Sequence, residues 1–296
     1  MGEAANSMLT ITEHARAKIN LTLRVLGRRA DGYHTLESLI TFADVGDAVR
    51  FAPGEPPSVE MSGLYAGAIT GSNLIDTALE RLTSADPALV LGRIEVDKQL
   101  PIAAGIGGGS ADAAAVLRAV RRANPAGKVN WEEIAASLGA DVTVCLADRT
   151  SHVWGAGEKI RPVADLPSLD AVLVCPLGAA PIGKTRAVFS QLSLPLAEPV
   201  KTPAPLPPFP DRDALLAYIR AVGNDLAAPA RAVMPVCAQA DTALRDCDEC
   251  VYVGLSGAGP TSFGIFTDGQ HAAAAAEILR TRHPGWWIAA TTLGDR

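Results

Sequence analysis

The sequence predicts a globular α+β protein with one large or two modest domains. The chain has 296 residues, and domains average roughly 150 residues. Hydrophobic residues make up 48% of the chain and charged residues 20%, which is the balance of a folded protein rather than a disordered one. Stretches with the periodicity of strands and of helices follow one another without the regular βα alternation of a doubly wound sheet, and this order favours α+β.

In the first half of the chain, apolar spacing and glycines delimit the elements. Leu74, Ala78 and Leu82 would share one face of a helix, whereas Ile94, Val96 and Lys98 alternate as in a strand. The predicted elements are strands and turns over 9–49, a helix over Asn73–Leu82, a strand over Arg93–Leu100, a helix after the glycine-rich segment Pro101–Ala115, and a helix over Trp131–Leu138.

The second half begins with a short apolar strand and contains a long proline-rich stretch. Seven prolines lie between Pro195 and Pro210, which excludes a helix or strand interior and predicts a surface loop. The predicted elements are strands over Ala171–Cys175, Val251–Leu255 and Ser262–Phe266, helices over Asp213–Val222 and Gln270–Arg282, and a final apolar stretch over Trp286–Ala290.

Charge and cysteine usage restrict the class of protein. A net charge of −6 argues against a nucleic-acid partner, so an anionic ligand must be held locally by a few lysines and backbone N–H groups. The five cysteines are odd in number and scattered, and the lone Cys247–Cys250 pair cannot fill a tetrahedral zinc site. No apolar run reaches the ~20 residues of a membrane helix. We therefore expect a reduced, cytoplasmic protein that is a monomer or weak homodimer.

The segment Pro101–Ala115 carries the strongest local signal. Its glycines at positions 105, 107, 108 and 109 let the backbone approach a ligand closely and adopt positive φ. Ser110 and Asp112 stand where a helix begins, at positions that favour capping side chains. Because free N–H groups at a helix start bind phosphate, the segment predicts a phosphate-binding loop rather than a plain turn. The Ser110 hydroxyl could also contact a phosphate or a metal ion.

A second segment, Gly178–Thr185, matches the Walker A pattern of nucleotide-binding loops. Pro181 removes a backbone donor within this loop, and Pro195 limits the helix that follows. Only 111 residues follow Thr185, too few for the parallel sheet of such enzymes, and no downstream strand ends in an aspartate for magnesium. We favour Pro101–Ala115 and keep Gly178–Thr185 as the alternative site.

Three separated segments together resemble the galactokinase, homoserine kinase, mevalonate kinase and phosphomevalonate kinase (GHMP) superfamily. They are Ala17–Leu21, Pro101–Ala115 and Gly254–Pro260, and their order and spacing cover most of the chain. Within the superfamily, Ala17–Leu21, Asp31–His34, the loop's Gly-Gly-Gly-Ser and Gly139–Asp141 resemble the branch that acts in the non-mevalonate isoprenoid pathway. Each segment is weak evidence alone, and the combination is specific.

The resemblance implies a fold and a reaction. It implies two domains, which we place at 1–164 and 165–296, with the active site in the cleft between them. It also implies ATP, magnesium and a cytidine diphosphate-linked methylerythritol whose 2-hydroxyl is phosphorylated. Catalysis of phosphoryl transfer depends mainly on positioning the reactants and stabilising the charge on the transferring phosphoryl group.

The resemblance also assigns candidate site residues by position. Lys18 and Asp141 would be the catalytic pair, with Asp141 accepting the hydroxyl proton and Lys18 offsetting charge on the phosphoryl group. The predicted ATP-binding residues are Asn73, Leu74, Ile75, Pro101, Ala103, Ala104, Gly105, Ile106, Gly107, Gly108, Gly109, Ser110 and Ala111. The predicted substrate-binding residues are Asn20, Tyr33, His34, Thr185 and Phe189. No carboxylate is assigned to the metal, for which Ser110 is the one candidate.

Simpler explanations exist for each of these residues. Lys18 could be a surface lysine, Asp141 a helix N-cap, and Asp31-Gly32 a hairpin turn that carries Tyr33 and His34. Two other functions also remain open. One is a GHMP kinase acting on homoserine or mevalonate, and the other is a nucleotide-binding protein that has lost catalysis. The presence of both Lys18 and Asp141 argues against the second.

Overall fold

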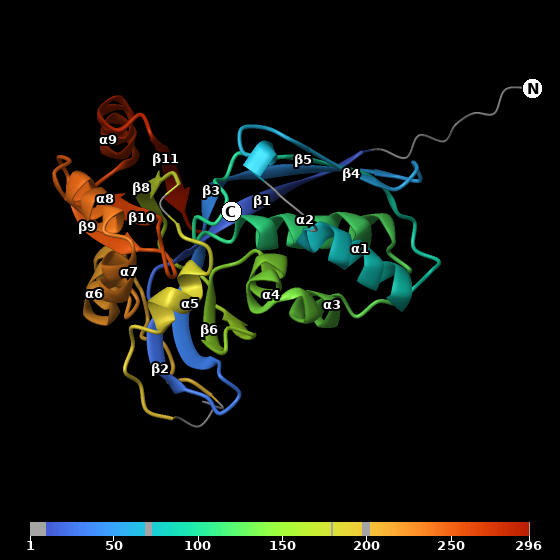
Figure 1. Ribbon diagram of the computed structural model, residues 1–296, viewed down its shortest axis with the longest axis horizontal. Coiled ribbons are helices and arrows are strands. Elements are labelled where there is room, and N and C mark those ends of the chain that lie inside the picture. The colour runs from blue at the N-terminus through green and yellow to red at the C-terminus, as the bar shows by residue number, and fades with distance from the viewer. Residues whose placement is uncertain (1–9, 69–72, 179, 197–201, 296) are drawn as a thin grey trace, which may run out of the picture.

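The computed structural model describes residues 10–68, 73–178, 180–196 and 202–295 and arranges them in two lobes (Figure 1). The first part of the chain forms β1 (Ile11–Asn20), β2 (Arg24–Arg28), β3 (His34–Pro53), β4 (Ser58–Ser62), η1 (Ala66–Ala68), α1 (Leu74–Ala85), β5 (Gly92–Asp97), α2 (Gly108–Ala123), α3 (Trp131–Leu138), α4 (Ala140–Ala147), β6 (Ser151–Gly155) and β7 (Lys159–Pro162). The second part forms β8 (Leu169–Pro176), α5 (Lys184–Phe189), α6 (Arg212–Val222), α7 (Ala227–Val233), α8 (Val236–Arg245), β9 (Cys250–Leu255), β10 (Ser262–Phe266), α9 (Gly269–Arg282) and β11 (Trp286–Leu293).

The long strand β3 organises the first sheet. It pairs antiparallel with β1, β2, β5 and β6, and β4 adds to β5 in parallel. Helices α1, α2 and α3 lie along one side of this sheet (Figure 1), and their apolar faces bury a core that includes Phe51, Ile94 and Val116. The alanine-rich α2 packs directly on β1 and β3. This packing holds the start of α2, and therefore the glycine loop before it, against the sheet.

The second sheet has the order β11-β8-β10-β9 and is antiparallel throughout. Helices α8 and α9 cover one face, where Leu244, Phe266 and Leu279 are buried. On the other face, Leu215 and Ile219 of α6 join a core that also contains residues of β1. The two sheets meet where β11 pairs with β3. This mixture of antiparallel sheets and helices confirms the α+β prediction.

Most predicted elements are present, with differences at their ends. The helices predicted over Asp213–Val222 and Gln270–Arg282 are α6 and α9, each starting one residue earlier. The strand predicted over Arg93–Leu100 ends at Asp97, because Asp47 accepts hydrogen bonds from the backbone N–H groups of residues 99 and 100 and turns the chain. The described prolines of the 195–210 stretch lie outside helices and strands, and Pro199 lies outside the described residues.

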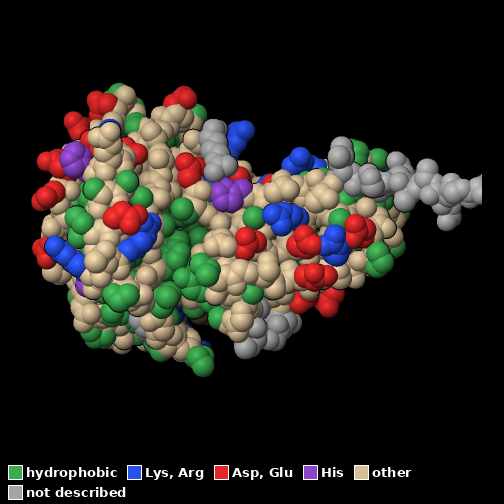
Figure 2. Space-filling view, turned by 90° about the horizontal axis from the view of Figure 1, so that it is seen from above, with side chains coloured by type: hydrophobic (Ala, Val, Ile, Leu, Met, Phe, Trp, Pro, Cys, Tyr) green, Lys and Arg blue, Asp and Glu red, His purple; other side chains and the backbone are tan. Residues whose placement is uncertain are grey.

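The sequence analysis does not predict the helices α4, α5, α7 and α8, which have six to ten residues. Within the described ranges, no helix is long and apolar enough to cross a membrane. Figure 2 shows basic and acidic side chains interspersed over the face that it presents, rather than a single basic patch.

A buried charged triad fixes the end of β5 to the start of α2. Lys98 is 1% exposed and contacts the carboxylates of both Asp47 and Asp112, which are also buried. Burial raises the pKa of Asp112 to about 7, with the charge of Asp47 adding to this and that of Lys98 opposing it. Removing one member of a buried ionic group typically costs 3–5 kcal/mol, because the remaining charges lose their compensation.

We predict that Lys98→Met lowers the free energy of unfolding by about 3–5 kcal/mol at pH 7 in urea titrations. A carboxylate whose pKa is higher in the folded protein than in the unfolded chain destabilises the fold as it ionises. The free energy of unfolding therefore falls as the pH rises from the unfolded-state pKa to the folded-state pKa. The deficit should therefore shrink at pH 5 and grow at pH 8. Arg93→Met, which removes an exposed ion pair on β5, should cost far less, because exposed pairs contribute little to stability. A deficit for Lys98→Met as small as this would contradict the assignment.

Candidate active site

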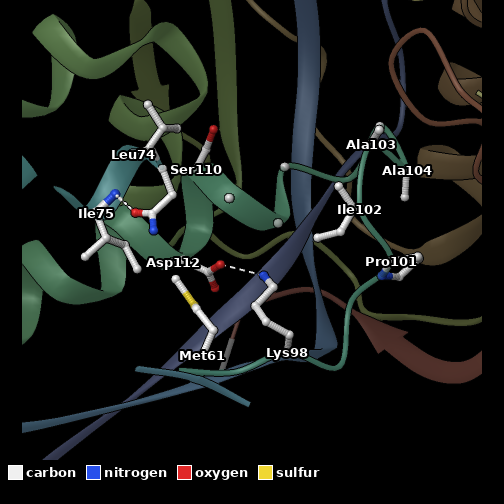
Figure 3. A pocket seen from close by; sticks show the side chains of 15 residues that line it. Met61, Leu74, Ile75, Lys98, Pro101, Ile102, Ala103, Ala104, Ser110 and Asp112 are labelled. Atoms are coloured by element: carbon white, nitrogen blue, oxygen red, sulfur yellow. Dashed lines mark hydrogen bonds and ion pairs between the residues drawn. The ribbon is translucent and has the colours of Figure 1, made fainter. Parts of the chain in front are cut away.

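A first cavity of about 340 Å³ lies between the segment that connects β5 to α2 and the start of α1 (Figure 3). Its wall combines apolar side chains with the backbone of the glycine loop. The lining residues are Met61, Asn73, Leu74, Ile75, Lys98, Pro101, Ile102, Ala103, Ala104, Gly105, Gly107, Gly108, Gly109, Ser110 and Asp112. An apolar cavity that ends at backbone N–H groups suits a base at one end and phosphates at the other.

The glycine loop leads into α2 with backbone donors available for a ligand. Gly107 adopts a left-handed conformation with φ of 71°, and α2 begins at Gly108. No side chain caps this helix, so the N–H groups of its first turn keep their hydrogen-bonding capacity. A Cβ atom on Gly109 would have no heavy atom within 4 Å, which leaves room for a ligand beside the backbone. This geometry can bind phosphate.

Eleven of the thirteen predicted ATP-binding residues line this cavity. Ile106 and Ala111 do not, because the side chain of each packs into a hydrophobic core instead. Asn73 lies in the wall, and its side-chain oxygen caps α1 by accepting hydrogen bonds from the N–H groups of Ile75 and Asp76. Ser110 and Asp112 lie inside α2 and do not cap it. Sequence reasoning did not assign Met61, Lys98, Ile102 and Asp112 to this site.

A second cavity, of about 190 Å³, lies between the two lobes and shares Gly105 and Gly107 with the first. Residues of both lobes contribute to it. The lining residues are Lys18, Asn20, Leu23, Leu36, Ser38, Ile40, Gly105, Gly107, Ala140, Asp141, Val153, Ala156, Gly157, Lys184, Thr185, Phe189, Leu226, Gly257 and Ala258. The shared glycines place it beside the phosphate end of the first cavity.

Lys18 and Asp141 meet in this second cavity. The Lys18 ammonium lies 3.4 Å from Oδ1 of Asp141 and 3.0 Å from Oδ1 of Asn20. The Asn20 amide in turn donates to Oγ of Ser38 at 2.8 Å, which fixes its orientation. Lys18 and Asn20 are two residues apart on β1, so they share one face of the strand, and both line the cavity. Lys18 is therefore buried, and it is not a free surface lysine.

Asp141 is presented by the start of α4. Gly139 caps this helix with φ of 150°, and the Asp141 side chain makes no capping hydrogen bond. That side chain is 49% exposed, so one carboxylate oxygen pairs with Lys18 while the group remains open to the cavity. The simple capping role considered from the sequence is wrong.

The predicted substrate-side residues divide into two groups. Thr185 and Phe189 of α5 line the second cavity together with Asn20. Tyr33 and His34 do not line it. His34 stacks on Phe189 with ring centroids 4.6 Å apart, whereas Tyr33 is 66% exposed in the turn between β2 and β3. The structure thus brings His34 to the edge of the cavity and leaves Tyr33 on the surface.

The third glycine segment packs against the glycine loop. A Cβ atom on Gly105 would lie 2.4 Å from the carbonyl oxygen of Gly259. The Thr261 N–H and hydroxyl both donate to the carbonyl oxygen of Ala104, and the Ser256 hydroxyl donates to that of Gly105. The turn at Gly254–Pro260 is therefore a clamp on the loop as well as the connection between β9 and β10.

The Walker-like segment does not build a Walker A site. Its described residues follow β8, whose neighbours are both antiparallel, and α5 has only six residues. Ala179 lies outside the described residues. Lys184 and Thr185 face the second cavity and not the first. Burial lowers the pKa of Lys184 to about 8, and the neighbouring charge of Lys18 acts in the same direction.

The cysteines add no further site. Burial raises the pKa of Cys250 to about 11 and that of Cys247 above its usual value. Across residues 10–68, 73–178, 180–196 and 202–295, no cluster of three or more histidines, cysteines or acids could hold a metal ion.

Comparison with known proteins agrees with this geometry. The GHMP kinases N terminal domain matches residues 73–153, and the GHMP kinases C terminal domain matches residues 214–285. The 4-diphosphocytidyl-2-C-methyl-D-erythritol kinase of Parvibaculum lavamentivorans is 43% identical and covers 96% of this chain and 98% of its own. That of Rhodopseudomonas palustris is 44% identical and covers 96% and 97%. This chain belongs to the 4-diphosphocytidyl-2-C-methyl-D-erythritol kinase family.

Comparison with solved structures shows that this chain shares its fold with other GHMP kinases. A crystal structure of a 4-(cytidine 5'-diphospho)-2C-methyl-D-erythritol kinase superposes with a TM-score of 0.76 at 31% identity, covering 97% of this chain and all of the other. Homoserine kinase from Cytophaga hutchinsonii gives a TM-score of 0.65 at 14% identity, covering 100% and 98%. The second likeness shows the common fold alone. Together with the two matched domains, these structures confirm the two-domain GHMP fold.

The two glycines Gly105 and Gly109 allow a matched test of the loop. Gly105→Ala should lower the free energy of unfolding by about 1–3 kcal/mol, because the residue has φ of 81° and the new methyl group meets Gly259. Gly109→Ala should change stability by less than about 1 kcal/mol. It should instead raise the KM for ATP, since the methyl group occupies the open side of the loop. Denaturant unfolding and steady-state kinetics measure both effects, and equal stability losses would contradict the assignment.

Proposed function

We propose that this protein transfers the γ-phosphoryl group of ATP to the 2-hydroxyl of 4-diphosphocytidyl-2-C-methyl-D-erythritol, in isoprenoid precursor biosynthesis. Two relatives, 43% and 44% identical over nearly the full chain, are named 4-diphosphocytidyl-2-C-methyl-D-erythritol kinase. The observation that carries the proposal is the Lys18–Asp141 pair, which lies in a cavity that joins the nucleotide-side cavity at Gly105 and Gly107.

The geometry supports distinct roles for the two cavities. We assign ATP to the first, with the base against the apolar wall near Leu74 and the phosphates at Gly107–Ser110. We assign the alcohol to the second, with its hydroxyl beside Asp141. In this arrangement the acceptor oxygen and the γ-phosphate face each other across the shared glycines, and holding them there supplies much of the catalysis.

In the proposed mechanism, Asp141 accepts the proton of the attacking hydroxyl. The Lys18 ammonium offsets the charge that develops on the transferring phosphoryl group, and Asn20 holds that ammonium in place. The N–H groups at the start of α2 stabilise the phosphate oxygens without moving, because the loop is anchored by the turn at Gly259.

The residues of the loop fit a magnesium ion held mainly by the nucleotide. Magnesium usually takes one or two protein oxygens, together with phosphate oxygens and water. Ser110, the third residue of α2, lines the first cavity and offers one such oxygen. When bound, the ion would neutralise charge between the β- and γ-phosphates. Asp112 forms an ion pair with Lys98, so we do not assign it to the metal.

We also propose a domain boundary at residues 164 and 165, between the last strand of the first part and β8. The location we propose is the cytoplasm, on the ground that Cys145, Cys175 and Cys237 are free thiols buried in the two lobes.

The proposed reaction is tested by measuring ADP release with three alcohols. We expect turnover with 4-diphosphocytidyl-2-C-methyl-D-erythritol, little with homoserine or mevalonate, and none after magnesium is removed by chelation. Turnover with mevalonate alone would overturn the proposal and favour another GHMP kinase activity.

We predict that Asp141→Asn lowers kcat about 10²–10⁴-fold, because the amide cannot accept the proton. The dissociation constant of ATP should change little, since Asp141 does not line the nucleotide-side cavity. Glu132→Gln, on the exposed surface of α3, is the matched control and should leave kcat unchanged. Unaltered turnover of Asp141→Asn would exclude this carboxylate as the base.

A further inference from the structure

Lys184 is a buried lysine that the mechanism above does not use. It is the first residue of α5 and belongs to the Gly178–Thr185 segment, whose Walker A interpretation the structure does not support. The residue is 8% exposed and lines the second cavity. Burying a charge is costly unless another group compensates it, so the partners of Lys184 are informative.

The three buried lysines of the described chain differ in their partners. Lys98 contacts two carboxylates, and Lys18 pairs with that of Asp141. Within the described residues, the Lys184 ammonium donates to one group, the carbonyl oxygen of Gly259, and forms no ion pair with an acid. An ammonium has three N–H donors, so two of them remain for a ligand.

The groups that face Lys184 leave its charge uncompensated. They are Lys18 of β1, Cys175 of β8 and Cys237 of α8. Burial raises the pKa of both thiols to about 11, so they are neutral between pH 7 and 9. Asp141 lies in the same cavity but pairs with Lys18. An anionic group of the ligand would supply the missing negative charge.

The position of Lys184 indicates which anion this is. Lys184 lines the second cavity and not the first, so the acceptor substrate is nearer than the adenine end of ATP. Phe189 lies five residues further along α5 in the same cavity, about 7–8 Å away at 1.5 Å per residue. Under the assignment of the acceptor to this cavity, with its base against Phe189 and its hydroxyl beside Asp141, the diphosphate that joins them also lies in the cavity that Lys184 lines.

We propose that Lys184 binds the diphosphate of the acceptor alcohol and thereby makes this enzyme selective for a phosphate-bearing acceptor. The inference rests on the proposed function, because it takes a nucleoside diphosphate-linked alcohol as the substrate. Thr185, the next residue, lines the same cavity and offers a hydroxyl to the same group.

The test compares Lys184→Met with the wild type, using cytidine diphosphate and cytidine as competitive inhibitors. The variant should bind cytidine diphosphate about tenfold more weakly and cytidine equally well, because only the first carries the charge. Its KM for the acceptor should rise by a similar factor, while its KM for ATP changes less than twofold. Arg186→Met removes an exposed charge from the same helix and should change none of these constants by more than about twofold.

The outcomes separate this inference from the proposed function. If the wild type phosphorylates the cytidyl substrate and Lys184→Met keeps its KM and its affinity for cytidine diphosphate, the inference is overturned and the function stands. If the wild type does not use that substrate, the proposed function fails. If it also fails to bind cytidine diphosphate, both fail. A fall in kcat alone, with all affinities kept, would mean a role at the transferring phosphoryl group and would overturn the inference.

A second measurement does not depend on how the methionine variant folds. Phosphate monoesters titrate near pH 6, so the charge of cytidine diphosphate is constant between pH 7 and 9.5. Because burial lowers the pKa of Lys184 to about 8, we expect wild-type affinity for cytidine diphosphate to fall across this range while the affinity for cytidine stays constant. Lys184→Arg, which keeps the charge at all these pH values, should bind cytidine diphosphate without the fall. The same slope in Lys184→Arg would contradict the proposal.

Discussion

The backbone contact between the glycine loop and the Gly254–Pro260 turn is the constraint on which the site depends. Gly105 and Gly259 approach so closely that a Cβ atom on Gly105 would not fit between the loop and the turn. Two donors of Thr261 converge on the carbonyl oxygen of Ala104, and the Ser256 hydroxyl reaches that of Gly105. These residues lie more than 150 positions apart and come from opposite lobes. The contact therefore fixes the phosphate loop and the orientation of the lobes together.

Lys18 is held by the same arrangement. Its backbone N–H donates to the carbonyl oxygen of Ile106 at 2.9 Å, and the side-chain carbon atoms of Lys18 fill the space beside Gly107. The strand, the loop and the turn thus form one hydrogen-bonded unit around the point where the two cavities meet. Hydrogen-bond donors that are already fixed stabilise developing charge without reorganisation, which is the form of catalysis that phosphoryl transfer requires.

The sequence predicted those parts of the site that local pattern encodes. The glycines of Pro101–Ala115 give the backbone unusual conformational freedom, so the sequence alone identifies the loop. Eleven of the thirteen residues predicted to bind ATP line the first cavity. The meeting of Lys18 with Asp141, 123 positions later, was predicted only through the family resemblance. Spacing along the chain contains no information about such a contact.

Ile102 and Asp112 lie within the predicted segment Pro101–Ala115, whereas Met61 and Lys98 were missed because tertiary packing alone gives them their position. Met61 lies on β4 and Lys98 beyond the end of β5, and nothing in their local sequence distinguishes them from other strand residues. Conversely, Ile106 has the right place in the motif but packs into a hydrophobic core, because an apolar side chain packs inward wherever the backbone allows it. Tyr33 lies in the turn that Asp31-Gly32 predicts, and its ring stays in solvent.

An acidic protein that binds polyphosphates must attract them by local rather than overall charge. Salt screening limits the distance over which exposed charges act to about 8–10 Å at physiological ionic strength. The net charge of −6 therefore affects ligand binding less than the few cations inside the cavities do. The three buried lysines differ in how far they are neutralised. Lys98 contacts two carboxylates, whereas Lys18 pairs with one, and the proposed mechanism uses its remaining charge at the phosphoryl group. Among the residues that the structure describes, the Lys184 ammonium contacts a carbonyl oxygen and no carboxylate, which leaves its charge available to a ligand.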